Sequence, residues 1–296
     1  MKILLFGKHG QLGWELNRSL QMLGEVTALG REDVDFSNPE SLRTLIDTVQ
    51  PAIIINAVAY TAVDKAEEEV SLATAINETA PAVLAQEATK RDILLVHYST
   101  DYVFDGSKDG AYLETDKPAP VNVYGRTKLA GEQAVQQAGG DYLIFRTSWV
   151  YASRGHNFLL TILRLAGERD SLTIVNDQLG SPTSARLIAD TSVLCLQQSL
   201  QEKAAGNFTS DLYHLTTSGQ TSWHGFAEAI MHMAADIFQQ PLKLSHIQAI
   251  PTIDYPTPAK RPLNSRLQLT RLEQHFAVRM PDWKRMLQLC MEEIKE

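Results

Sequence analysis

Residues 7–13, GKHGQLG, form a glycine-rich turn between an apolar run and a helical pattern near the start of the chain. Residues 2–6, KILLF, are continuously apolar, which is typical of a strand buried in a parallel sheet. From Gln11 to about Leu23, leucines recur on one side of a helix. Because glycine allows a tight turn and a close backbone approach, we predict a strand, a turn and a helix over residues 2–23.

The same alternation of strand and helix continues to about Thr147. A helix is predicted to open at Ser37, as its cap, with Pro39 in its first turn. Strands alternating with helices at this spacing predict an α/β fold with a doubly wound parallel sheet, covered on both faces. The further strands are expected at 25–29, 51–56, 93–98 and 142–147, and the further helical stretches at 63–90 and 124–137.

The regular alternation weakens after Thr147, where aromatic residues, prolines and single arginines become frequent. We therefore expect a nucleotide-binding domain over residues 1–148 and a smaller, mainly substrate-binding region over 149–296. Two later segments, 212–215 and 223–238, are expected to pack back on the sheet.

Composition restricts the partners of the chain. Its 296 residues are 44% hydrophobic, carry a formal net charge of −8 and contain no block of Lys and Arg, which argues against a nucleic-acid surface. The first apolar run is too short for a signal peptide or a membrane span. Two distant cysteines give no metal-binding spacing. We expect a cytoplasmic protein without nucleic-acid or membrane partners and without a protein-bound zinc site.

The glycine-rich turn predicts a dinucleotide site, because a helix N-terminus behind such a turn can face a pyrophosphate. The spacing is GxxGxxG, not the commoner GxGxxG, and a plain strand-to-helix turn remains the alternative. Where the second strand ends, an acidic ribose ligand is usual, but this chain has Gly30 and Arg31. A guanidinium suits a 2′-phosphate, so we expect NADPH to be preferred, with NADH also used. Arg31 could instead be a solvated loop cation. Asp35 and Phe36 are expected to lie near the adenine.

Tyr124 and Lys128 share one face of a predicted helix at the spacing YxxxK. A free tyrosine has a pKa of about 10, and a neighbouring cation lowers that value. The pair can therefore transfer a proton while a hydride arrives from the cofactor. Taken alone, YxxxK is as consistent with an ordinary surface pair.

The fourth strand ends on Ser99, Thr100 and Asp101. A hydroxyl at this point can polarise a substrate carbonyl. We favour Thr100, with Ser99 as the alternative, and the strand period does not distinguish them. All three residue types also favour turns, so turn chemistry is the competing interpretation.

Together these motifs resemble the extended short-chain dehydrogenases and, more narrowly, the dTDP-4-dehydrorhamnose reductase family. The resemblance covers nearly the whole chain and implies a Rossmann-type domain with a small C-terminal substrate-binding domain. It implies reduction of dTDP-4-dehydro-β-L-rhamnose to dTDP-L-rhamnose, for surface polysaccharides such as O-antigen. Besides the glycine turn, its motifs are NAVAYTAVDKAE (56–67), STDYVFDG (99–106), NVYGRTKLAGE (122–132), RTSWVY (146–151), NDQLGSPT (176–183) and YPTPAKRPLNS (255–265).

The resemblance also implies roles for single residues. Thr100, Tyr124 and Lys128 match the catalytic set, of which Tyr124 and Lys128 also contact the cofactor, and Asp101 and Trp149 match substrate contacts. Position 60 is often His in the family, a departure that concerns cofactor packing and not the chemistry. The positions that match pyrophosphate contacts are Gly10, Gln11 and Leu12, and those that match residues beside the cofactor are Ala59, Tyr60 and Thr61. Gly7, Gly13 and Ala57 are further expected cofactor-binding residues.

Some relatives form homodimers through Mg²⁺ held by acidic side chains, and Glu15 matches such a ligand. The chain has Arg186 where a further acid is expected. This departure argues against Mg²⁺ here and leaves homodimer formation open.

A dTDP-sugar carries a diphosphate, so an acidic protein needs local cations to bind it. Arg261 and Arg266 lie in a run without helical or strand period, and arginine grips phosphate oxygens bidentately. Pairing with carbonyls or surface acids is the alternative for both.

Two competing functions remain. A nucleotide-sugar 4-epimerase of the same fold usually keeps an acidic ribose ligand, which Gly30 and Arg31 replace. A noncatalytic NADP-binding regulatory subunit tends to lose the catalytic residues, which are present here.

Overall fold

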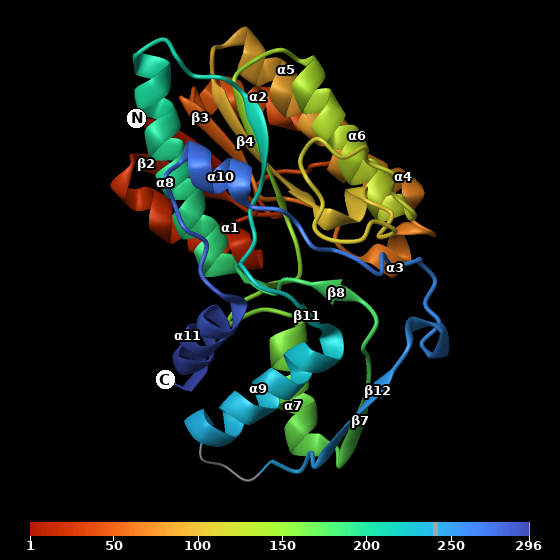
Figure 1. The fold of residues 1–296 in the computed structure, drawn as a ribbon. Helices are drawn as coiled ribbons and strands as arrows, with labels where there is room; N and C mark the ends of the chain where they lie inside the picture. Colours follow the sequence, from red (N-terminus) through yellow and green to blue (C-terminus); the bar gives the residue numbers. More distant parts are fainter. Residues whose placement is uncertain (239–241, 296) are drawn as a thin grey trace.

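A six-stranded parallel sheet forms the centre of the larger of two lobes (Figure 1). The computed structural model describes residues 1–238 and 242–295; the others, 239–241 and 296, fall in the expected substrate-binding region and lie outside this description. Phe6 pairs with Leu29 on one side and Asn56 on the other, so these strand ends share one edge of the sheet. The strands lie in the order β2 (Glu25–Leu29), β1 (Lys2–Phe6), β3 (Ile53–Asn56), β4 (Leu94–Thr100), β5 (Tyr142–Thr147) and β10 (Asp211–His214).

Helices cover both faces of the sheet (Figure 1). On one face, α1 (Gln11–Ser19), α8 (Ala185–Ala204) and α10 (Thr270–His275) enclose an apolar core, and α1 continues as a 3₁₀ turn, Leu20–Met22. On the other, α2 (Pro39–Val49), α5 (Ala80–Lys90) and α6 (Val123–Gln137) enclose a second core. The connection from β3 to α5 holds α3 (Val63–Ala66), α4 (Val70–Thr74) and a π-helix, Ala75–Thr79.

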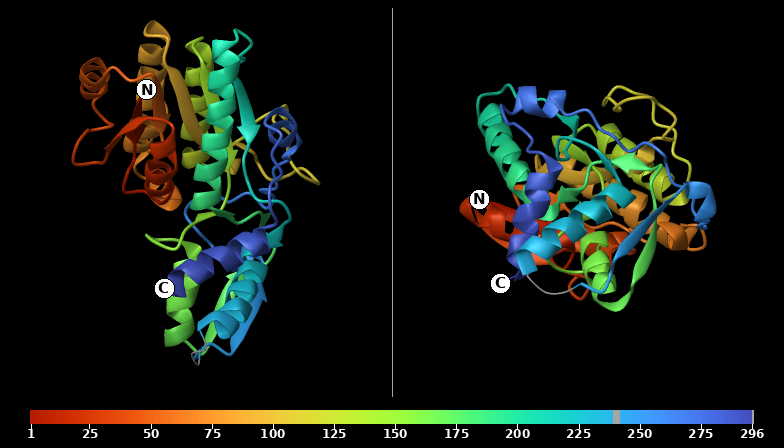
Figure 2. Two further views of the ribbon diagram at one scale, coloured as in Figure 1. Left: turned by 90° about the vertical axis from the view of Figure 1, so that its left-hand side faces the viewer. Right: turned by 60° about the horizontal axis from the view of Figure 1, so that its bottom comes forward.

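A smaller lobe lies beyond one end of the strands of the sheet (Figures 1 and 2). Its separate core contains Tyr151, Phe226 and Trp283. Its helices are α7 (Phe158–Glu168), α9 (Trp223–Phe238) and α11 (Trp283–Lys295), and β7 (Ser171–Val175) pairs with β12 (His246–Ile250). Two short strand pairs lie where the chain passes from one lobe to the other. They are β6 (Val150–Tyr151) with β9 (Thr183–Ser184), and β8 (Leu179–Gly180) with β11 (Thr221–Ser222). A 3₁₀ turn spans Thr252–Asp254.

The predicted parallel sheet is confirmed, and the segment 212–215 does join it through β10. The expectation for 223–238 is wrong, because α9 packs against α7 and α11 and not against the sheet. The start of α2 also differs: Asn38 caps it by accepting from the Glu40 amide at 3.1 Å, whereas the Ser37 hydroxyl donates to Asp35 at 2.6 Å. Pro39, at the first helical position, is as predicted.

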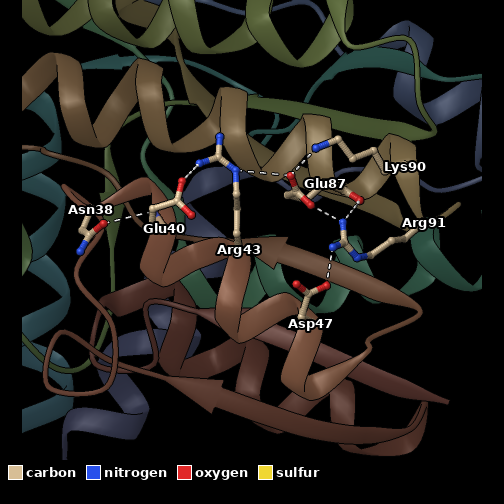
Figure 3. Close-up of polar contacts among 7 residues, drawn as sticks. All are labelled: Asn38, Glu40, Arg43, Asp47, Glu87, Lys90 and Arg91. Carbon is tan, nitrogen blue, oxygen red and sulfur yellow. Dashed lines mark hydrogen bonds and ion pairs between the residues drawn. The ribbon is translucent and has the colours of Figure 1, made fainter.

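A buried carboxylate ties α2 to α5 (Figure 3). The Glu87 side chain is 3% exposed and accepts from Lys90 at 2.8 Å and from Arg91. Arg43 reaches it from α2 at 3.5 Å, and Arg91 pairs with Asp47. Burial opposes ionisation of Glu87, but the hydrogen bonds from Lys90 and Arg91 hold its pKa below the ordinary value. The charged network therefore holds α2 against α5, toward the ends of these helices that lead into β3 and β4.

In the described parts of the chain, 1–238 and 242–295, we find no helix whose length and apolar character would suit a membrane crossing.

Candidate functional site

The chain leaves β1 toward β2 on one side and later returns to β3 on the other, so the sheet order reverses at β1. Such a reversal opens a crevice at the carboxyl ends of the two strands. A cavity of about 910 Å³ lies there. It is lined by Gly7, His9, Gly10, Leu29, Gly30, Arg31, Val34, Asp35, Phe36, Ser37, Ala57, Val58, Ala59, Tyr60, Leu72 and Ile76.

Two glycines of the turn have no tolerated replacement. Gly7 has φ +95°, and a Cβ on it would stand 3.0 Å from the carbonyl oxygen of Ala57. A Cβ on Gly13 would overlap the carbonyl oxygen of Gly7, so α1 packs directly on the turn. Gly10 caps α1 without a side-chain bond, which leaves the first amides of the helix available to a ligand. The turn therefore fits a pyrophosphate against the start of α1.

Most predicted cofactor residues line this cavity. Arg31 and Asp35 are exposed there, whereas Phe36 is 8% exposed and packs edge-on against Phe6 at 5.1 Å between ring centres. The Tyr60 hydroxyl donates to Glu69, and this bond raises its pKa to about 12. Gly7, Gly10, Ala57 and Ala59 complete the predicted residues that line the cavity.

Four predicted cofactor residues of the turn and the β3 loop are not part of the lining: Gln11, Leu12, Gly13 and Thr61. The Gln11 side chain instead accepts from Asn157 of the smaller lobe at 2.9 Å. Sequence reasoning missed His9, Leu29, Gly30, Val34, Ser37 and Val58, all next to strand ends where a positional signal existed. It also missed Leu72 and Ile76, which the helical stretch after β3 brings in without any motif.

Thr100 and Tyr124 lie close together at the carboxyl end of β4. Thr100 ends β4, and Tyr124 lies in the first turn of α6, which Asn122 caps by accepting from the Gly125 amide at 2.8 Å. The Thr100 side chain lies close enough to Tyr124 to affect its ionisation. Burial raises the pKa of Tyr124 to about 12, and the neighbouring Thr100 hydroxyl opposes the rise. Of the two strand-end hydroxyls, the structure thus brings Thr100 to Tyr124, while the buried Ser99 hydroxyl has no hydrogen-bond partner among the described residues.

Lys128 lies one helical turn further along α6 and is 1% exposed. Its ammonium donates to the carbonyl oxygen of Tyr98 at 2.6 Å. Burial lowers its pKa to about 8, and the negative charge of Glu132 opposes the shift. Lys128 therefore supplies a desolvated cation under this edge of the sheet, and it stays protonated at neutral pH.

Asp101 follows Thr100 and is 2% exposed. It accepts from the Thr100 hydroxyl at 3.0 Å. Burial raises its pKa to about 6, while the neighbouring Ser265 and Thr100 hydroxyls oppose the rise. The carboxylate thus holds the Thr100 hydroxyl.

Trp149 has φ +48°, a backbone conformation that is strained for a bulky residue. Its indole stacks on that of Trp223, with ring centres 3.7 Å apart and planes inclined by 11°. A Cβ on Gly180 would stand 2.6 Å from the Trp149 ring. Because strain of this kind persists only where the surroundings enforce it, Trp223 and Gly180 together hold Trp149 in place.

Arg261 and Arg266 lie in a loop, as expected, but both already have partners. Arg261 pairs with Asp64 through two bonds, of 3.1 and 2.8 Å, which is the alternative foreseen for it. Arg266 donates to the neutral side chains of Asn264 at 2.8 Å and Gln220 at 3.1 Å, and the carboxylate of Asp109 stands 3.8 Å from its guanidinium.

Glu15 also has a cation beside it. It is 5% exposed, and Arg186 stands 3.5 Å from its carboxylate and 3.3 Å from that of Glu293. Within residues 1–238 and 242–295, no group of three or more His, Cys, Asp or Glu side chains could hold a metal ion.

The reversal of strand order, the glycine cradle and the cavity define a dinucleotide-binding α/β protein. The profile of the RmlD substrate binding domain family matches residues 1–296, so the chain belongs to that family. It is 50% identical over 295 residues to a dTDP-4-dehydrorhamnose reductase of Burkholderia thailandensis, covering 99% of each chain.

Two solved structures of dTDP-4-dehydrorhamnose reductases have the same fold as this chain. That of a dTDP-4-dehydrorhamnose reductase from Clostridium acetobutylicum has a TM-score of 0.89 and 34% identity, covering 100% of both chains. One from Bacillus anthracis, in complex with NADP, has a TM-score of 0.87 and 32% identity, covering 99% of both.

Proposed function

We propose that this chain reduces the 4-keto group of dTDP-4-dehydro-β-L-rhamnose to dTDP-L-rhamnose with NADPH or NADH. The observation that carries the proposal is the proximity of the Thr100 and Tyr124 side chains at the carboxyl end of β4, the same end of the sheet at which the nucleotide cavity opens. The substrate follows from the relatives, which are named for this reaction. The product would serve surface polysaccharides such as O-antigen.

The roles of the side chains follow from their positions. When bound, the reduced nicotinamide supplies a hydride to C4 of the sugar. The Tyr124 hydroxyl donates its proton to the C4 oxygen, whose carbonyl electron pair becomes the new O–H bond. Thr100 turns its hydroxyl proton from Asp101 to the same oxygen, donates a hydrogen bond to it and polarises it. Lys128 stabilises the tyrosinate that remains and bonds the ribose, and Trp149 packs on the sugar.

The direct test mixes the purified protein with the dTDP-keto sugar and follows NADPH absorbance. We expect consumption of one NADPH per sugar reduced. An epimerase would convert the sugar without net consumption of NADPH. A regulatory subunit would neither convert the sugar nor consume NADPH. Either of these two results would refute the proposed reaction.

Arg31 is proposed to read the 2′-phosphate of NADPH, because it lines the cavity and is exposed. We expect Arg31→Ala to raise the Michaelis constant for NADPH by about tenfold, the equivalent of about 1.4 kcal/mol. The constant for NADH should change little. An equal increase for both cofactors in steady-state kinetics would show that Arg31 does not recognise the phosphate.

Arg261 and Arg266 are proposed to bind the diphosphate of the sugar nucleotide. Arg266 is the more available, since its hydrogen-bond acceptors are uncharged and the carboxylate of Asp109 stands 3.8 Å away, whereas Arg261 shares its guanidinium with Asp64 at 2.8 Å. We expect Arg266→Ala or Arg261→Ala to weaken binding of dTDP by roughly 1.5–3 kcal/mol, the usual contribution of a charge-assisted hydrogen bond.

Calorimetric titration with dTDP measures this effect. Arg164→Ala is the matched control, because Arg164 forms only an exposed pair with Glu168 on α7. NADPH affinity should be unchanged in all three variants. Unchanged dTDP affinity in both loop variants would exclude this loop as the diphosphate site.

A further inference from the structure

Glu32 occupies the space that a side chain at the end of β2 would fill. The strand is followed by Gly30, which has no side chain. A Cβ built on Gly30 would stand 2.5 and 2.8 Å from the two carboxylate oxygens of Glu32. The chain therefore lacks an acid at position 30 but places a carboxylate over that position from two residues further along.

A lysine and a histidine side chain hold this carboxylate. His9 contacts Glu32 at 2.7 Å, and the ammonium of Lys8 stands 2.9 Å from it. Lys8 also pairs with Asp33 at 2.6 Å, and Asp33 in turn accepts from the Gly30 amide at 2.8 Å. The hydrogen bond from Lys8 is the main reason why the pKa of Glu32 lies at about 2. Glu32 is thus an ionised acceptor in a fixed position at neutral pH.

The position lies beside the nucleotide cavity, since Gly30, His9 and Arg31 all line it. In dinucleotide-binding folds, a carboxylate at the end of the second strand accepts a hydrogen bond from the ribose 2′-hydroxyl. We propose that Glu32 performs this task here and is a cofactor-selecting residue, a role that rests on the proposed use of NAD(P)H.

Glu32 and Arg31 then act in opposite directions. The carboxylate accepts from the 2′-hydroxyl of NADH but repels the 2′-phosphate of NADPH, which Arg31 attracts. Because the two residues are adjacent, neither cofactor obtains a site free of conflict. This arrangement predicts that the protein uses both cofactors, with a modest preference between them.

Glu32→Gln tests the role with little risk to the fold, since the Glu32 side chain is 53% exposed and the new amide has nearly the same shape. Dissociation constants of NADH and NADPH for the free protein are measured by fluorescence titration. We expect NADH binding to weaken and NADPH binding to tighten, so that the ratio of the two constants changes by about tenfold, the equivalent of about 1.4 kcal/mol. Glu25→Gln, at the other end of the same strand and also exposed, should change neither constant.

Opposite changes for the two cofactors support the role, because a general disturbance of the loop would weaken both. Equal weakening of both, or no change in either, would overturn it. Binding is measured without the sugar, so the result does not depend on turnover. If the wild type binds both cofactors yet fails to reduce the keto sugar, the proposed reaction fails while the role of Glu32 is still decided by these constants.

Discussion

Replacing Tyr124 by phenylalanine is expected to lower kcat by about 100-fold or more, the usual contribution of a positioned general acid. The substitution removes the proton-donating hydroxyl that lies beside Thr100 at the carboxyl end of β4. Cofactor affinity and the melting temperature should remain near those of the wild type, because only a hydroxyl is lost. Stopped-flow or steady-state measurement of NADPH oxidation with the keto sugar gives the rate.

Tyr142→Phe is the matched control for that variant. Tyr142 is also partly buried, but it begins β5, at the end of the strand opposite to Thr147. Its hydroxyl should be irrelevant to turnover. A Tyr124→Phe protein with kcat close to that of the wild type would contradict the assignment of Tyr124 as the acid.

Lys128→Met is expected to reduce kcat by a comparable factor and to remove a limb of the pH profile. With a pKa of about 8, Lys128 is a cation below pH 8 and loses its proton above it. The wild-type rate should therefore fall as the pH rises through about 8, because the neutral amine no longer stabilises the tyrosinate. The residual rate of the variant should lack this fall, and a fall of the same size in the variant would exclude Lys128 as its cause.

The same variant should gain stability in the absence of ligands. A lysine whose pKa is lowered in the folded state destabilises the fold while it is charged, here fully below about pH 8. Between about pH 8 and its ordinary value of 10.5 the folded wild type loses this proton first, and the penalty disappears. The free energy of unfolding of Lys128→Met should thus equal or exceed that of the wild type at pH 7, with a smaller difference at pH 10. Lower stability at pH 7 would show that Lys128 serves the fold.

The sheet could be predicted because its strands are continuous apolar runs that end in glycine or polar residues. Residues 2–6 and 142–147 match β1 and β5 in both bounds. A smaller second region was also expected, but the short strands that connect it to the sheet could not be predicted, since β6, β8, β9 and β11 have two residues each and no period to detect. The packing of α9 was missed for a related reason: an apolar helix face shows that a partner exists but not which one.

The residues that line the nucleotide cavity could likewise be predicted only in part. Gly7, Arg31 and Phe36 were predicted because each stands at or just after a strand end, and all three line it. Leu72 and Ile76 enter from helices far along the chain, so only folding brings them there. The opposing charges beside Arg31 were also invisible, because the sequence does not show that Glu32 bends back over Gly30.

Transfer of deuterium from NADPH labelled at C4 of the nicotinamide tests the central claim most directly. Wild-type protein is incubated with the labelled cofactor and dTDP-4-dehydro-β-L-rhamnose, and the sugar product is analysed by mass spectrometry and NMR. The proposed reaction predicts dTDP-L-rhamnose with deuterium bound to sugar C4, in amounts equal to the NADPH consumed. A sugar product without the label, or conversion of the sugar while NADPH remains, would contradict it.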